Sequence, residues 1–244
     1  MRPRYAIVLA AAIVYAVGRY VPFGDYALYP LTLFTTWVHE MGHGMTALAL
    51  GGRFDSLEIF GNAAGLAQAY AAPGWRDALV ALGGLLAPPI VGAAILAFVH
   101  GPKRARVVLV VLAAALALSL VLYVRSTAGV IAMPIVAAGL LYAAWWAPSH
   151  RVIVAQVLGV VLALDTLTRM VGYVFEDSVE VDGKKQWSDI HNVASQLGGH
   201  YVVWGMAVTA VAVGLLALGL WWAWRRPEPG AATIRASVRR ELAS

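Results

Sequence analysis

Apolar residues dominate the chain in seven long runs separated by short polar or charged segments. A helix needs about 20 apolar residues to cross the hydrocarbon core of a bilayer. The pattern therefore predicts membrane helices at Tyr5–Val21, Leu31–Leu50, Ala78–Val99, Val107–Val124, Ala128–Ala147, Val152–Phe175 and Tyr201–Trp224. The first run is long enough to span, so we interpret it as a retained helix in preference to a cleaved signal peptide.

A polar insertion, residues 51–77, follows the second predicted helix. Gly51–Gly52 ends that helix. Polar and apolar residues alternate along Ser56–Ile59, Gly61–Asn62 is a turn signal, and Leu66–Tyr70 is a candidate return strand. We predict a short β-hairpin here, with an irregular interfacial loop as the alternative.

A second polar insertion covers residues 176–199. Ser188 is a suitable N-cap for a short helix that runs to about Leu197. We expect residues 1–226 to form one transmembrane domain that includes both insertions, and residues 227–244 to form a polar C-terminal tail.

Composition supports a membrane protein. Hydrophobic residues make up 61% of the chain and charged residues only 13%, against about a quarter charged in soluble domains. The net charge of +5 comes from short basic clusters beside apolar runs, such as Lys103–Arg106 and Arg225–Arg226. Such clusters are typical of contact with anionic lipid headgroups, not with nucleic acid. We therefore predict an all-α polytopic membrane protein with about six to seven transmembrane helices.

The second apolar run contains the sequence His39-Glu40-Met41-Gly42-His43. On a helix, residues four apart share a face, so both imidazoles can reach one zinc ion. Glu40 would lie beside them as a general base that takes a proton from water. Ionisable residues inside an apolar segment usually have a function. The alternative is a polar cluster that stitches helices together.

Three segments of the chain, the first of which contains the His39–His43 motif, resemble the site-2-protease family of intramembrane zinc metalloproteases, and in particular its bacterial branch. The resemblance is carried by HEMGHGMTALALGGRFDSLEIF, by ALGGLLAPPIVGAAI, and by LALDTLTRM followed by WSDIHNVASQLGGHYVVWG. Together they cover most of Leu31 to Gly205. The resemblance implies a helical protease in the bacterial cell membrane that binds one zinc ion and hydrolyses peptide bonds of membrane-protein or peptide substrates.

The resemblance also implies a third zinc ligand from an aspartate on a later helix, which Asp165 matches best. Better-studied members have Leu-Asp-Gly at this place, whereas this chain has Leu164-Asp165-Thr166. Those members also use an asparagine to stabilise the oxyanion, and residues 83–93 contain none. The group that stabilises the oxyanion is left open.

Two aspartates compete for the third ligand position. Asp165 lies at a depth in its predicted span that matches the depth of the two histidines, at 1.5 Å per residue. Asp189 lies outside any predicted span and follows the capping Ser188, so Asp165 is preferred and Asp189 is second. The alternative for Asp165 is a helical ion pair with Arg169, four residues on.

Two signals disagree about the orientation of the chain in the membrane: the positions of the basic residues and the family resemblance. Seven crossings with Lys103–Arg106 and Arg151 in the cytoplasm put the N-terminus outside, against Arg2 and Arg4. The resemblance implies the opposite orientation, with the C-terminal end of the zinc-binding helix toward the cytoplasm.

A substrate must unwind before its backbone can reach the metal, because helical amides and carbonyls are already paired. A strand edge within Ser56–Phe60 or Leu66–Tyr70 can pair with the unwound segment. We predict Leu57, Ile59 and Asn62 as substrate-binding residues.

Two other functions compete with the endopeptidase. One is a catalytically silent regulatory membrane protein that keeps the zinc site, which the retention of Glu40 disfavours. The other is a proton or metal transporter, which the scarcity of further charges inside the apolar runs disfavours. The oligomeric state, substrate and cleavage site are not predicted.

Overall fold

The computed structural model describes residues 3–18, 20–173, 178–181 and 183–225. Its elements are, in order, α1 (Pro3–Gly18), α2 (Gly24–Ala49), β1 (Arg53–Ile59), β2 (Gly65–Tyr70), α3 (Trp75–Phe98), α4 (Pro102–Leu122), α5 (Thr127–Trp145), α6 (Arg151–Tyr173), β3 (Ser178–Val181), β4 (Lys184–Trp187), α7 (Asp189–Leu197) and α8 (Tyr201–Arg225). The predicted helical fold with a hairpin after the second helix is confirmed.

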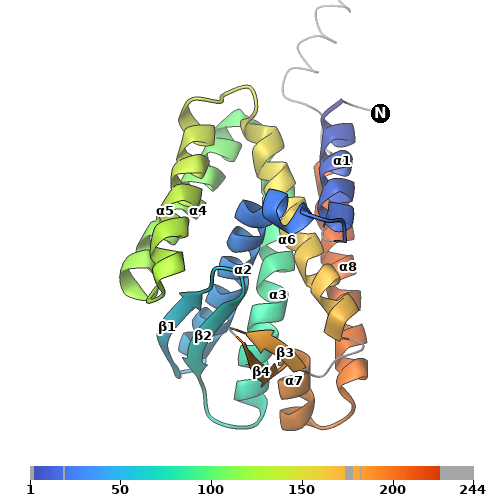
Figure 1. Ribbon diagram of the computed structural model, residues 1–244. Coiled ribbons are helices and arrows are strands. Elements are labelled where there is room, and N and C mark those ends of the chain that lie inside the picture. Colours follow the sequence, from blue (N-terminus) through green and yellow to red (C-terminus); the bar gives the residue numbers. More distant parts are fainter. Residues whose placement is uncertain (1–2, 19, 174–177, 182, 226–244) are drawn as a thin grey trace, which may run out of the picture.

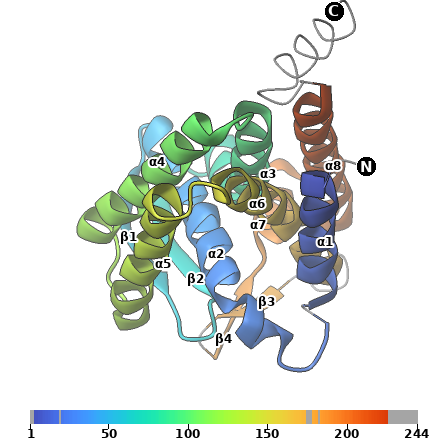
Figure 2. The ribbon, with the colours of Figure 1, turned by 90° about the horizontal axis from the view of Figure 1, so that it is seen from above.

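The long helices form one bundle with α2, α3 and α6 at its centre. Figure 2 shows α4 and α5 on one side of this centre and α1 with α8 on the other. Helix α3 packs against α2, α6, α7 and α8 and is the main support of the bundle. Both hairpins and α7 lie at one end of the bundle, which is the lower end in Figure 1.

Five of the described helices are long and apolar enough to cross a membrane: α3, α4, α5, α6 and α8. Helix α1 has a shorter apolar stretch, Val8–Gly18, and α2 is not among the five. Each of the seven predicted runs contains a helix, so the predicted architecture agrees with the structure. The first two predicted spans differ from the other five in their length or composition.

Helix α2 ends at the predicted glycine pair. Gly51 has φ of +76°, the left-handed conformation that glycine adopts without a steric penalty. The Gly52 amide donates to the Ala47 carbonyl at 2.8 Å, and the Gly51 amide donates to Leu48 at 3.1 Å. This double closure is a Schellman motif, which turns the chain sharply into β1.

The β1–β2 hairpin is antiparallel, and β1 is already paired on its other side. The Leu57 amide donates to the Tyr123 carbonyl at 2.9 Å, and the Arg125 amide donates to the Leu57 carbonyl at 3.1 Å. The connection between α4 and α5 therefore covers the outer edge of β1. No other described strand pairs with the outer edge of β2.

The predicted short helix in the second insertion is confirmed as α7. Ser188 is its N-cap, and its hydroxyl accepts a hydrogen bond from the His191 amide at 3.2 Å. The sequence did not indicate the β3–β4 hairpin that precedes it. The predicted tail, residues 227–244, lies outside the described residues.

Candidate metal centre

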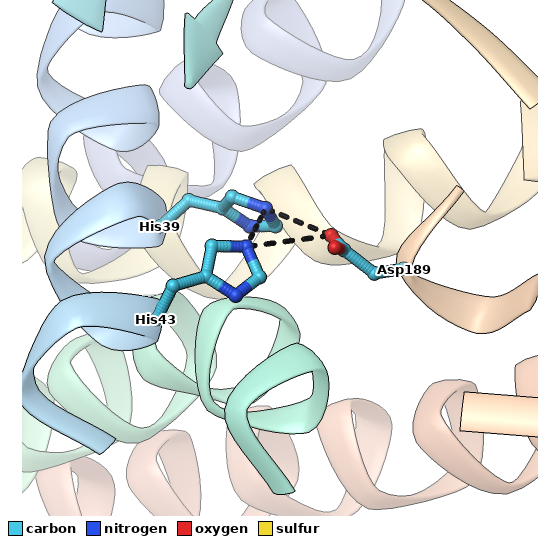
Figure 3. A group of neighbouring side chains, drawn as sticks. All are labelled: His39, His43 and Asp189. Atoms are coloured by element: carbon cyan, nitrogen blue, oxygen red, sulfur yellow. Dashed lines mark hydrogen bonds and ion pairs between the residues drawn. The ribbon is translucent and has the colours of Figure 1, made fainter. Parts of the chain in front are cut away.

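The two motif histidines face each other from successive turns of α2. Their Nε2 atoms lie 3.2 Å apart, and the ring planes are almost perpendicular, at 84°. Both side chains are buried. Figure 3 shows the two rings directed to the same point beside α2. The helical spacing of four residues therefore brings two nitrogen donors together, as predicted.

Contacts with α3 fix the ring of His43. Its Nδ1 donates to the Val80 carbonyl at 2.8 Å, which leaves the Nε2 lone pair available for a metal. A Cβ atom added to Gly84 would lie only 2.1 Å from His43 Nε2. Residue 84 lies against the imidazole ring, so only glycine leaves enough space for it there. The two helices also meet at Gly42, where a Cβ atom would lie 2.4 Å from the Gly83 carbonyl oxygen.

The third donor at this point is Asp189, the first residue of α7. Its Oδ2 atom lies 3.1 Å from His39 Nε2 and 3.5 Å from His43 Nε2 (Figure 3). One donor atom from each of the three residues lies within 4.8 Å of the other two. Burial raises the pKa of Asp189, but the neighbouring His43 and His39 hold it well below its usual value, so the carboxylate stays ionised.

Packing of α7 against the bundle brings Asp189 to the histidines. Ile190 and Val193 of α7 are fully buried. Ile190 belongs to an apolar cluster with Leu85 of α3, Met170 of α6 and Val208 of α8. At the far end of α7, the Gln196 side chain accepts a hydrogen bond from the Gly74 amide at 2.8 Å. Asp189 therefore reaches the centre by tertiary packing across a long stretch of sequence.

Glu40 is buried between α2 and β2. A Cβ atom added to Gly65 would lie 2.6 Å from both Cγ and Oε1 of Glu40, so the carboxylate lies against the strand backbone. The Thr36 hydroxyl donates to the Ala63 carbonyl at 2.9 Å and holds the start of β2 against α2. These contacts hold the predicted base beside the histidines.

The donors open into a cleft of about 410 Å³. Its walls include His39, Glu40, His43 and Asp189, together with Ala67 and Ala69 of β2, Asp77 and Val80 of α3, Arg169 of α6, and Gln186 and Trp187 of β4. The unpaired edge of β2 therefore lies along the same cleft as the metal donors.

Asp165 is in a different environment from the one predicted. It is fully buried in α6. Its Oδ1 accepts hydrogen bonds from the Tyr15 hydroxyl at 3.0 Å and the Thr35 hydroxyl at 2.9 Å. Its Oδ2 accepts from Arg169 Nε at 2.7 Å. The predicted alternative, an ion pair with Arg169, is therefore present.

The structure thus reverses the order of the two aspartates. Asp189, the second choice from the sequence, lies with His39 and His43, and Asp165 is not part of that group. Matching depths along two predicted spans did not reveal that Tyr15, Thr35 and Arg169 already surround Asp165. The cap at Ser188 correctly predicts the start of α7. In the sequence it counts against Asp189 as a ligand, because a carboxylate after the cap is already explained by the helix dipole.

The three predicted substrate residues do not line the cleft. Leu57 and Ile59 are buried in the main apolar core, and the backbone of Leu57 is bound to the α4–α5 connection. Asn62 lies in the hairpin turn, where its side chain accepts a hydrogen bond from the Ala64 amide at 3.0 Å. The cleft is lined instead by β2, including Ala67 and Ala69, whose small side chains carry no signal in the sequence.

The fold and the site together define a helical membrane protein with a group of two histidines and one aspartate that could hold a metal ion. A model of the Peptidase M50B-like family matches residues 5–219, and the chain therefore belongs to that family. The match confirms the resemblance to site-2-protease-like enzymes. No curated protein and no solved structure matches the chain.

Proposed function

We propose that this protein is an intramembrane zinc endopeptidase in which His39, His43 and Asp189 hold the metal and Glu40 is the general base. The observation that carries the proposal is the convergence of three donor atoms within 4.8 Å, on a cleft that Glu40 also lines. Family membership supports the reaction class. Following the resemblance, we expect the enzyme in a bacterial cell membrane, acting on membrane-protein or peptide substrates.

The donor set suits zinc. Two imidazole nitrogens and one carboxylate are the three protein ligands usual at catalytic zinc, which keeps a further position open. The chain has no cysteine that would offer a competing thiolate. Bound zinc would act as a Lewis acid and lower the pKa of a coordinated water to about 7. The hydrogen bond from His43 to Val80 supports this assignment, because ligating histidines usually donate their second ring N–H to an oxygen acceptor.

Glu40 moves the proton in this proposal. Its carboxylate accepts a proton from water as the water oxygen bonds to the carbonyl carbon of the scissile peptide. The same proton then passes to the amide nitrogen as the carbon–nitrogen bond breaks, which releases a carboxylic acid and an amine. Burial of Glu40 against Gly65 holds the carboxylate between its own helix and the strand that lines the cleft.

The outer edge of β2 presents the substrate backbone in this proposal. Backbone groups alternate in direction along an antiparallel strand. Leu57 bonds outward to Tyr123 and Arg125, so its partner in β2, Ala67, also directs its amide and carbonyl away from β1. Ala67 and Glu40 both line the cleft. An unwound substrate segment can therefore add to β2 as a further strand.

Replacement of Glu40 by Gln tests the general-base role. Purified Glu40→Gln protein should keep about one zinc ion per chain, because both imidazoles and Asp189 stay in place. Its cleavage of unfolded casein in detergent should fall by about 10²–10⁴-fold, the usual contribution of a general base. Glu58→Gln is the matched control, because Glu58 lies on β1 outside the cleft and should leave cleavage unchanged.

The same measurements separate the competing functions. A silent zinc-binding protein would hold zinc and cleave nothing even in the unaltered chain. A transporter would move protons or metal across liposomes without proteolysis. Full protease activity in Glu40→Gln protein would contradict the assignment of Glu40.

A further inference from the structure

The cleft at the candidate metal centre has two walls. One wall is β2, the strand that presents the substrate in the proposed function. The other wall consists of the end of β4 and the start of α7, and it contributes Gln186, Trp187, Asp189 and Asn192 to the lining. Strands β2 and β4 belong to separate sheets, and the cleft lies between them. Of this second wall, the proposed function uses only Asp189.

Two carboxamides on the second wall differ from the others in the protein. The chain has two asparagines and four glutamines, six carboxamides in all. Four of them form hydrogen bonds inside the protein: Asn62 with Ala64, Gln68 with Glu58, Gln156 with Val99, and Gln196 with Gly74. Within the described part of the chain, the carboxamides of Gln186 and Asn192 have no hydrogen-bond partner, although both residues are partly buried. The two carboxamides without a partner are thus the two that line the cleft.

Asn192 lies one helical turn from the third metal donor. It follows Asp189 by three residues in α7, and residues at this spacing are neighbours on a helix surface, with Cβ atoms about 5–6 Å apart. Helix α7 is held in its rotation, because Ile190 and Val193 on an adjacent face are fully buried. The side chain of Asn192 is therefore kept beside Asp189, on the side of the cleft.

Gln186 is held by the β3–β4 hairpin and by α7. It pairs with Val179 of β3 in an antiparallel register. The next residue, Trp187, stacks on His191 of α7, with ring centroids 4.1 Å apart and ring planes within 12° of parallel. This contact joins β4 to α7. Gln186 and Asn192 therefore flank the metal donor Asp189 on one supported wall.

A substrate strand added to β2 has a second edge that also needs partners. Backbone groups alternate in direction along a strand, so pairing with β2 uses only about half of the amides and carbonyls of the segment. The other groups point away from β2, across the cleft. Leaving them unpaired away from water costs free energy. A carboxamide suits these groups, because it offers both a donor and an acceptor, as the peptide backbone does.

We propose that the second wall binds the backbone of the substrate, with Gln186 and Asn192 bonding to the amides and carbonyls that β2 leaves open. Because both residues flank Asp189, they bind the segment close to the scissile bond. The ligand is an extended peptide that is recognised through its backbone, whatever its side chains. This role rests on the proposed function, because β2 must carry the substrate for the second edge to face this wall.

Binding of an unfolded substrate by protein that does not cleave it tests this role. The background is Glu40→Gln, and the probe is fluorescein-labelled, unfolded casein, whose dissociation constant is measured by fluorescence anisotropy in detergent. Asn192→Leu and Gln186→Met remove the carboxamides and keep most of the side-chain volume. Each should weaken casein binding by about tenfold, the scale of one or two lost hydrogen bonds. Zinc content should stay at about one ion per chain.

Ser195→Ala is the control, because Ser195 is exposed on α7 outside the cleft and should leave casein binding unchanged. Unchanged binding in both carboxamide variants would overturn the proposal. So would loss of zinc from Asn192→Leu, which would make Asn192 a support for Asp189 instead, or the absence of casein binding by the Glu40→Gln protein. If the carboxamide variants weaken binding while the unaltered protein cleaves no casein, the proposed reaction fails and the second wall stands.

Discussion

Two carboxylates near the centre of this protein have different kinds of partners. Asp165 receives hydrogen bonds from two hydroxyls and a guanidinium, and it is sealed inside the bundle. Asp189 faces the ring nitrogens of His39 and His43 and borders the cleft. A carboxylate whose oxygens already accept from protein donors joins helices together. A carboxylate that faces two imidazole nitrogens is the one placed to complete a metal site.

The ion pair between Asp165 and Arg169 is connected to the candidate metal centre through further hydrogen bonds. Arg169 bonds to Asp165 through Nε and to the Thr36 hydroxyl through Nη2 at 3.0 Å. Thr36 in turn donates to Ala63 at the start of β2. A chain of hydrogen bonds therefore links α6, α2 and the strand that lines the cleft. We assign Asp165 a positioning role, and Asp189 the role of ligand.

The largest expected effect is on zinc binding, and it tests the difference between Asp189 and Asp165 directly. Asp189→Ala should weaken zinc binding by more than about 100-fold, since loss of outer-shell partners alone costs about 10–100-fold. Asp165→Asn should keep about one zinc ion per chain. Zinc content is measured by mass spectrometry after dialysis against a graded series of chelator concentrations. Zinc lost from Asp165→Asn but retained in Asp189→Ala would restore the sequence-based preference for Asp165.

The second effect concerns stability. Asp165→Ala leaves Arg169 partly buried without its carboxylate partner, and breaking such a pair typically costs about 3–5 kcal/mol. The variant should therefore melt well below the unaltered protein in detergent. Asp55→Ala is the control, because its pair with Arg53 is largely exposed and should contribute no more than about 1 kcal/mol. Equal melting of the two variants would remove the structural role of Asp165.

A third prediction extends the comparison from the donors to the strand beside them. Ala67→Pro removes an amide that points from β2 away from β1, on the side of the cleft, and an edge strand tolerates proline at such a position. Cleavage of a membrane-protein substrate should fall by about tenfold or more, the scale of one or two lost hydrogen bonds. Zinc content should not change. Ala67→Val keeps the amide and should cleave normally; equal loss in both variants would point to the side chain instead.

The smallest expected effect sharpens the ligand role of Asp189. Ser188→Ala removes the N-cap that sets the start of α7, at a cost of about 1 kcal/mol. Part of that cost should appear as zinc binding that is up to about fivefold weaker. Ser195→Ala, on the same helix and exposed, is the control. If both variants bind zinc equally well, the cap does not position Asp189.

Local sequence patterns predicted the parts of this protein that depend on neighbouring residues. The two histidines meet because of helical periodicity, and the hairpin follows α2 because Gly51 and Gly52 end that helix. Ser188 likewise predicted the start of α7. Each of these features is determined within a few residues, so it can be read from the chain directly.

The features that the sequence did not predict depend on long-range packing. Asp165 and Asp189 were ranked by depth, which does not reveal that Tyr15, 150 residues away, already bonds to Asp165. Similarly, both hairpin strands were candidates for the substrate edge. The connection between α4 and α5 covers β1 and leaves β2 along the cleft, and no pattern within the hairpin distinguishes the two strands.

The zinc ligands themselves are the central claim, and anomalous X-ray diffraction at the zinc absorption edge tests them most directly. Crystals of the Glu40→Gln protein, which should keep its metal, are suited to the measurement. We expect one anomalous peak per chain, bounded by His39 Nε2, His43 Nε2 and a carboxylate oxygen of Asp189. A peak that Asp165 contacts in place of Asp189, or no peak between the two histidines in zinc-loaded crystals, would contradict the account.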